Sequence, residues 1–202
     1  PRTGQPWDLS DKVVQSRVRK LVRDTRPFCV IGSPPCTPFS RLQEISRVVR
    51  DPAVMDEQLR KRQEHVRFCL QIYQMQLNGK RHFIHEHPRD AKSWNLESVK
   101  ELLRDHRVTW VEGHMCLFGM TAPITGTDEV GPAKKPIGIM SSSRHVAAEL
   151  NRYCDGSHEH VHLVAGKAAA AQVYPADPCE AMLRGTAKQK REDESRLIST
   201  SA

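Results

Sequence analysis

The chain has 202 residues, of which 38% are hydrophobic, and its 31 lysines and arginines exceed its 24 aspartates and glutamates to give a net charge of +7. That length supports one globular domain with a core of its own. No apolar run approaches the length of a membrane span and no charged start leads into an apolar stretch, so we expect neither a span nor a secretory signal. The positive surplus favours a polyanionic partner, nucleic acid above all, although a soluble protein with a mildly basic surface has the same composition.

Six cysteines are spread along the chain without a regular frame or a CxxC pair. This spacing is typical of reduced thiols rather than of a disulfide scaffold, so we expect an intracellular, reducing compartment such as the nucleus. The chain opens with "PRTGQPWDLS", without Met, and we expect it to be a piece of a longer parent. The cysteines are Cys29, Cys36, Cys69, Cys116, Cys154 and Cys179.

Helix and strand patterns alternate along the chain. Ser10 is placed to cap the first helix, and Gly79 to end the second. From Thr186 the chain is charged and rich in small residues, so we expect one domain over residues 1–185 and a disordered tail over residues 186–202. In chain order, we predict helix 10–22, strand 28–31, loop 37–54, helix 56–78, strand 82–84, helix 95–104, strand 108–111, loop 121–135, strand 136–140, helix 143–153, strand 161–164 and a helix after Pro175.

Strands separated by helices favour an α/β fold, with a mostly parallel sheet covered by helices on both faces. Ligands bind such sheets at the carboxyl ends of the strands. Two strand ends carry reactive side chains: "VIGSPPCTPFS" (residues 30–40) contains Cys36, and "HFIHEHP" (residues 82–88) contains Glu86 just past a predicted strand. We therefore expect these two residues to form the core of a site.

The residues before Cys36 suit a positioned nucleophile. Pro34 and Pro35 each fix φ and together form a stiff arm, while Gly32 lets another group approach the backbone closely. A thiol held in this way needs less ordering before it reacts, and the Glu86 carboxylate can serve it as an acid or a hydrogen-bond partner. A buried structural cysteine in a proline turn is the alternative interpretation.

The same residues carry a family resemblance. "GSPPCTPFS" resembles the nucleophile loop of cytosine-5 DNA methyltransferases, Pro-Cys-Gln-x-x-Ser, and "HEHP" resembles that family's Glu-Asn-Val or Glu-Asn-Pro motif. "CLFGM" followed by "KKP" is similar to a later strand and its basic residues, and "VYPADPCEAM" to the family's last helix. The likeness covers roughly residues 7–185 and is greatest to the divergent methyltransferase-like domains of mobile-element polyproteins.

This resemblance implies a Rossmann-like S-adenosylmethionine-dependent methyltransferase fold whose first strands are missing. It implies that Cys36 attacks C6 of a cytosine flipped out of DNA, with RNA as the alternative substrate. Glu86 would hold N3 and the exocyclic amine, and S-adenosylmethionine would supply the methyl group to C5. By the same resemblance, substrate-binding residues are Pro35, Ser40, His87, Lys134 and Lys135, and cofactor-binding residues are Asp8, Gly32 and Pro34.

The chain also departs from the family pattern. Thr37 replaces the usual Gln, and His87 replaces the usual Asn. The glycine-rich cofactor loop Phe-x-Gly-x-Gly-Gly, expected before Trp7, is absent from this sequence. We therefore expect methyl transfer in the longer parent and little in this piece. The alternative is a non-catalytic, basic nucleic-acid-binding domain, a methyltransferase relic.

Two further patterns remain open. "CDGSHEHVHL" brings Cys and His residues together as in zinc sites, but its alternating histidines also suit one face of a strand, hydrogen-bonded and without metal, and we expect no metal there. The metal candidates are Cys154, His158, His160 and His162.

A basic set beside the Cys36 loop either contacts phosphates or forms an exposed helix end. It comprises Arg41, Arg47, Arg50, Arg60, Lys61 and Arg62.

Overall fold

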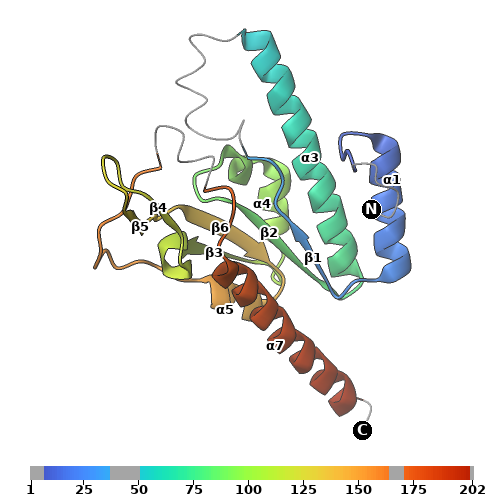
Figure 1. Ribbon diagram of the computed structural model, residues 1–202. Helices are drawn as coiled ribbons and strands as arrows, with labels where there is room; N and C mark the ends of the chain where they lie inside the picture. The colour runs from blue at the N-terminus through green and yellow to red at the C-terminus, as the bar shows by residue number, and fades with distance from the viewer. Residues whose placement is uncertain (1–6, 37–50, 164–170, 201–202) are drawn as a thin grey trace. The chain divides into compact units, whose positions relative to one another are not determined.

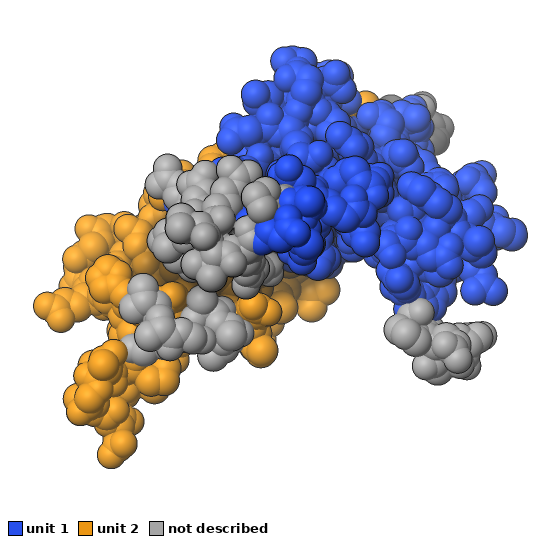
Figure 2. All heavy atoms as spheres, turned by 90° about the horizontal axis from the view of Figure 1, so that it is seen from above, with its two compact units in different colours: residues 1–85, 90–106 blue, residues 86–89, 107–202 orange. Residues whose placement is uncertain are grey.

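The computed structural model describes residues 7–36, 51–163 and 171–200. It divides the chain into two compact units, the first formed by residues 1–85 and 90–106 and the second by residues 86–89 and 107–202. Figure 1 shows the elements along the chain and Figure 2 colours the two units. Strand β2 crosses from the first unit to the second. The sequence predicted one domain over residues 1–185.

The first unit begins with helix α1 (Lys12–Thr25), which Asp11 caps by accepting a hydrogen bond from the Val13 amide. Ser10 was the predicted cap, but its amide and hydroxyl donate instead to Asp8 Oδ1 in the preceding turn. Helix α3 (Pro52–Asn78) ends at Gly79 as predicted, and begins four residues earlier than predicted because Asp51 caps it. The two helices lie side by side (Figure 1) and share a cluster of buried apolar residues: Val22, Phe68 and Ile72.

Strands β1 (Cys29–Gly32) and β2 (His82–Pro88) pair in parallel, with Cys29 opposite His82 and Gly32 opposite His85. Strand β2 is longer than predicted, so Glu86 lies within the strand rather than past its end. The polar residues of "HEHP" gave no sign that the strand continues past residue 84. A strand buried on both faces lacks the usual alternation of apolar and polar residues from which a strand is predicted. The unit is completed by a 3₁₀ turn (Lys92–Asn95) and helix α4 (Glu97–Leu103).

The second unit contains the remaining strands: β3 (Thr109–His114), β4 (Thr121–Pro123), β5 (Val130–Pro132) and β6 (Pro136–Ser141). Strands β3 and β6 pair antiparallel, with Thr109 opposite Ser141 and His114 opposite Pro136. The predicted loop 121–135 contains the antiparallel pair β4 and β5. Residues 161–163 of the predicted strand 161–164 are not a strand, and residue 164 lies outside the described residues.

The fold is therefore α/β, but its sheet is mixed rather than mostly parallel. Its strand order is β1-β2-β6-β3, and β1 with β2 forms the one parallel pair identified in the described residues. The reason lies in the connections. Parallel neighbours need a crossover, usually a helix, and helix α3 supplies it between β1 and β2. Only a 3₁₀ turn and the β4–β5 pair join β3 to β6, and these two strands run antiparallel.

Helix α7 (Ala176–Thr200) corrects the prediction of a disordered tail over residues 186–202, of which residues 201–202 lie outside the described part. The charges that looked like a solvated tail support the helix. Within α7, Arg184 pairs with Glu180 and Lys190 with Glu194, each four residues apart. Against α5 (Arg144–Leu150), Gln189 accepts a hydrogen bond from Ser143, while Arg144 and His145 contact Glu192.

Helices α5 and α7 approach so closely that Gly185 has no room for a side chain. A Cβ added there would lie 2.6 Å from Val146 Cα and 2.9 Å from the His145 carbonyl oxygen. Val146, Leu150 and Ala181 around this contact are fully buried. In the described part of the chain, no helix is long and apolar enough to cross a membrane.

This contact gives the first prediction. Gly185→Ala should lower the free energy of unfolding by about 1–3 kcal/mol, because the backbone of α5 must shift to admit the methyl group. It should do so although Ala is the better helix former by about 0.8–1 kcal/mol. Urea unfolding followed by circular dichroism measures the change. Leu183→Ala on the exposed face of α7 is the control, expected within about 0.5 kcal/mol of the parent; a stabilising Gly185→Ala would contradict the described packing.

Candidate functional site

The segment after β1 carries Cys36 on an irregular stretch in the first unit. Residues 33–36 have no regular secondary structure. Pro34 is buried, Pro35 is exposed and Cys36 is half-buried. The first proline of this stretch is thus covered and the second is exposed to solvent, and Cys36 after them is partly accessible. Ser40 and Thr37, which follow in the same motif, lie outside the described residues.

Gly32 lies where β1 meets a buried aromatic group. A Cβ at this position would collide with the Tyr73 hydroxyl. Tyr73 Oη lies 2.9 Å from His85 Nδ1 in a hydrogen bond, and the Tyr73 ring stacks on Phe83 at a centroid distance of 4.5 Å. The group that approaches the backbone at Gly32 is therefore a tyrosine of the same unit, so packing alone requires this glycine. Its predicted contact with a cofactor has no counterpart among the described contacts.

Glu86 belongs to the second unit and is held by a residue 88 positions away. Its side chain is only 6% exposed, and Tyr174 Oη donates a 2.7 Å hydrogen bond to Glu86 Oε1. Lys135 Nζ lies 4.3 Å from the centre of the Tyr174 ring and donates a 2.5 Å hydrogen bond to the Ala171 carbonyl. The structure thus brings the two predicted residues Glu86 and Lys135 together through Tyr174.

Tyr174 was not among the predicted site residues. Its only signal in the sequence is its place in "VYPADPCEAM", directly before the last helix, and nothing there indicates contact with β2. The ring also borders a hollow of about 250 Å³, smaller than the roughly 300–1,000 Å³ of typical small-molecule pockets. The hollow is lined by Gly119, Met120, Thr121, Ala122, Pro123, Ala171, Val173, Tyr174 and Pro175.

The other predicted substrate residue in β2, His87, is buried, with 1% of its surface exposed. Lys134 is half-buried, and its carbonyl accepts a 2.8 Å hydrogen bond from the Met115 amide. The described structure gives Lys134 a backbone role at the start of the 3₁₀ turn Met115–Phe118.

Asp8 lies in the first unit, in the turn before α1. Hydrogen bonds from the Ser10 amide (2.9 Å) and then the Ser10 hydroxyl (2.8 Å) hold the pKa of Asp8 below its usual range. It borders a hollow of about 410 Å³ between the start of α1 and helix α3. The hollow is lined by Trp7, Asp8, Leu9, Ser10, Gln15, Gln58, Lys61, Arg62, Glu64 and His65.

The basic set beside the Cys36 loop is partly neutralised on α3. Arg60 bonds Glu57 at 2.8 Å and Glu64 at 2.6 Å, and Lys61 lies 3.6 Å from Glu57. These exposed ion pairs contribute little to stability, but any phosphate must compete with them. The arrangement fits the interpretation as an exposed helix end. Arg41, Arg47 and Arg50 lie outside the described residues.

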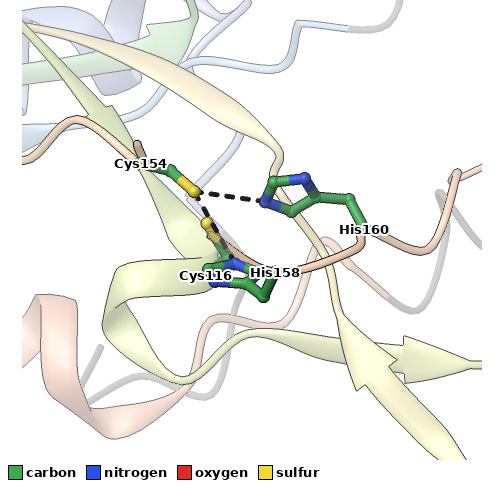
Figure 3. A group of neighbouring side chains, drawn as sticks. All are labelled: Cys116, Cys154, His158 and His160. Carbon is green, nitrogen blue, oxygen red and sulfur yellow. Dashed lines mark hydrogen bonds between the residues drawn. The ribbon is translucent and has the colours of Figure 1, made fainter. Parts of the chain in front are cut away.

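A group of sulfur and nitrogen atoms forms in the second unit (Figure 3). Cys154, His158 and His160 converge as the sequence allowed, while exposed His162 is not part of the group. The fourth member is Cys116, 38 residues before Cys154 and undetectable from local spacing. Burial, then contact with Cys154, raises the pKa of the Cys116 thiol to about 11.

Comparison with known proteins adds no relative. No protein-family model, curated protein or solved structure matches the chain.

Cysteine reactivity provides a direct test of the Cys36 arm. Iodoacetamide at pH 7 should label Cys36 first, because a poised nucleophile combines access with a raised thiolate fraction. Cys69 should be slow, because burial raises its pKa to about 11 and leaves about one thiol in 10⁴ ionised at that pH. Peptide mapping by mass spectrometry at short times gives the order. Labelling led by Cys69, or by exposed Cys179, would contradict a poised Cys36.

Proposed function

We propose that this chain supplies the catalytic half of a cytosine-5 methyltransferase of Rossmann-like fold, with Cys36 as nucleophile and Glu86 as acid. One observation supports it above the others: β1 and β2 pair in parallel with Gly32 opposite His85. The arm to Cys36 leaves directly after Gly32, and Glu86 directly follows His85. Parallel strands present their carboxyl ends at the same edge, where α/β enzymes place their ligands.

The proposed chemistry begins with addition to the pyrimidine. The Cys36 thiolate forms a bond to C6, the C5–C6 double bond shifts to C4–C5, and N3 takes the proton of Glu86. C5 then becomes the nucleophilic carbon of an enamine and accepts an electrophile, either a methyl group or a proton from water. Water then takes the original C5 hydrogen as a proton, the thiolate leaves C6 with the electrons of the C–S bond, and N3 returns its proton to Glu86, which restores the ring and the acid. The base must leave its stack to reach these groups.

The surroundings of Glu86 suit an acid that must hold one orientation. Its side chain is buried, and the Tyr174 hydroxyl donates a hydrogen bond to Oε1. Lys135 acts on Tyr174 rather than on a base: its ammonium lies over the ring and also binds the Ala171 carbonyl. A cation over an aromatic face stabilises the pair by about 0.5–2 kcal/mol. We therefore assign Lys135 and Tyr174 as positioning residues.

S-adenosylmethionine is the cofactor that the family resemblance implies, and it would supply the methyl group. Of the predicted contacts, Gly32 faces Tyr73 and Pro34 is buried. Asp8 and Trp7 border a hollow with room for an adenine ring. Of the residues assigned to the cofactor, only Asp8 therefore borders a hollow, and the addition step above uses none of Asp8, Gly32 and Pro34.

The rival function is a non-catalytic nucleic-acid-binding domain. The net charge of +7 supports binding to DNA or RNA under either proposal. The packing of Tyr73 on Gly32 favours the rival function, because it explains the glycine of this motif by packing alone, without catalysis. A test must therefore separate chemistry at C5 from binding.

Exchange of the C5 hydrogen makes that separation, because it needs no methyl donor. With DNA tritiated at cytosine C5, the chain should release tritium to water through reversible addition of Cys36. Cys36→Ala should lower the rate at least 100-fold, since no bond to C6 can form, and Glu86→Gln should lower it strongly. Cys179→Ala, at an exposed cysteine in α7, is the matched control and should stay within about twofold.

DNA binding is measured on the same variants. All should bind within about twofold of the parent, with affinity falling as salt rises. Unchanged exchange in Cys36→Ala would remove the proposed nucleophile. Salt-sensitive binding without exchange on any DNA or RNA tried would favour the binding domain instead.

The hydrogen bond to Glu86 can be tested alone. Tyr174→Phe should lower the exchange rate about two- to tenfold, because a side-chain hydrogen bond that orients the acid is worth about 0.5–1.5 kcal/mol. Combined with Glu86→Gln, it should add much less than its separate effect, since both changes act on one interaction. Tyr153→Phe is the control, because that hydroxyl contacts a different carboxylate, Glu112, at 3.4 Å. Equal effects of the two Tyr→Phe changes would contradict the positioning role.

A further inference from the structure

The group of Cys116, Cys154, His158 and His160, called here the Cys/His cluster, has no part in the proposed reaction. Cys116 lies in the 3₁₀ turn after β3, and the other three lie in the segment after α5. Their ligand atoms all lie within 4.8 Å of one another, and all four residues are half-buried. Figure 3 shows both sulfurs and both imidazoles pointing toward one centre.

From this geometry we propose that the Cys/His cluster is a structural zinc site. In tetrahedral zinc sites the Zn–S and Zn–N distances are about 2.3 Å and about 2.0–2.1 Å, which places the ligand atoms about 3.3–3.8 Å apart. Cys154 Sγ lies 3.4 Å from His160 Nε2 and 3.7 Å from His158 Nε2. These two separations already match the edges of such a tetrahedron, and every other pair of ligand atoms lies within 4.8 Å, about 1 Å beyond those edges.

The donor types select the ion. Two thiolates and two imidazoles suit zinc, whereas Ca²⁺ and Mg²⁺ take oxygen ligands. Four protein ligands fill a tetrahedral shell, so no position remains for water or substrate and the ion stabilises structure. Binding of Zn²⁺ converts both thiols to thiolates and releases their two protons to solvent.

The backbone around Cys154 is already fixed for this role. The His114 amide donates to the Arg152 carbonyl at 2.9 Å, and His114 Nδ1 accepts a 2.9 Å hydrogen bond from the Cys154 amide. His114 Nε2 in turn contacts Glu112 Oε1 at 2.8 Å. Since His114 ends β3 and Cys116 follows two residues later, the same strand end orients both sulfurs.

The turn between Cys154 and the histidines adds a contact to sulfur. Gly156 has a positive φ of 79°, which brings its amide within 3.4 Å of Cys154 Sγ as a donor. Amide donors of this kind stabilise a metal-bound thiolate from outside the ligand shell. Past the histidines, the Val161 amide binds the Pro132 carbonyl at 2.8 Å, so the segment is attached at both ends.

The test uses the full chain and Zn²⁺. Protein purified with zinc should contain one equivalent by atomic absorption, and a chelator should remove it and lower the melting temperature by about 10 °C. Co²⁺ in place of Zn²⁺ should give the visible bands of tetrahedral coordination together with thiolate charge transfer. Co²⁺ spectra without thiolate bands, or no retained zinc, would overturn the proposal.

Variants assign the ligands. Cys116→Ser and His160→Ala should each lose zinc, whereas His162→Ala and Cys179→Ser should keep one equivalent. If a ligand variant fails to fold, the Co²⁺ spectrum of the parent still decides the matter. Equal zinc loss in His162→Ala would overturn the assignment, and so would a disulfide between Cys116 and Cys154 found by mass spectrometry of the unreduced protein.

Discussion

A single buried hydrogen bond, between Tyr73 Oη and His85 Nδ1, joins helix α3 to strand β2 in the first unit. Tyr73 is 1% exposed and His85 is 0% exposed, and burying two polar groups costs free energy unless they form hydrogen bonds. Their bond ties α3 to β2, and the Tyr73 hydroxyl then occupies the space where β1 would carry a side chain at Gly32. This contact explains why β1 carries a glycine where it pairs with His85, directly before the segment that leads to Cys36.

The second unit repeats this principle around another buried polar residue. Glu86 receives its hydrogen bond from a tyrosine far along the chain, and a lysine covers the tyrosine ring. In each unit an aromatic hydroxyl stabilises a polar residue of β2. His85 and Glu86 are tolerated side by side in a buried strand for this reason.

The sequence predicted most elements, because their signals are local. Helix α3 ends at Gly79 as predicted, and β1 and β6 lie within one residue of their predicted bounds. Several errors involve contacts distant in sequence. The hydrogen bond of Tyr174 to Glu86 and the contacts of α7 with α5 are of this kind, whereas the antiparallel pairing of β3 and β6 follows from their connection. Tyr174 and Cys116 were missed for the same reason, since each joins its group only through tertiary contacts.

One pair of backbone contacts links the turn that contains Cys116 to the segment that contains Lys135. The Met115 amide binds the Lys134 carbonyl at 2.8 Å and contacts the Lys135 carbonyl at 3.4 Å. Met115 precedes Cys116 in the chain, and Lys135 carries the ammonium over Tyr174. The turn that contains Cys116 and the segment that contains Lys135 thus share one amide, and loosening of either segment would remove a backbone contact from the other.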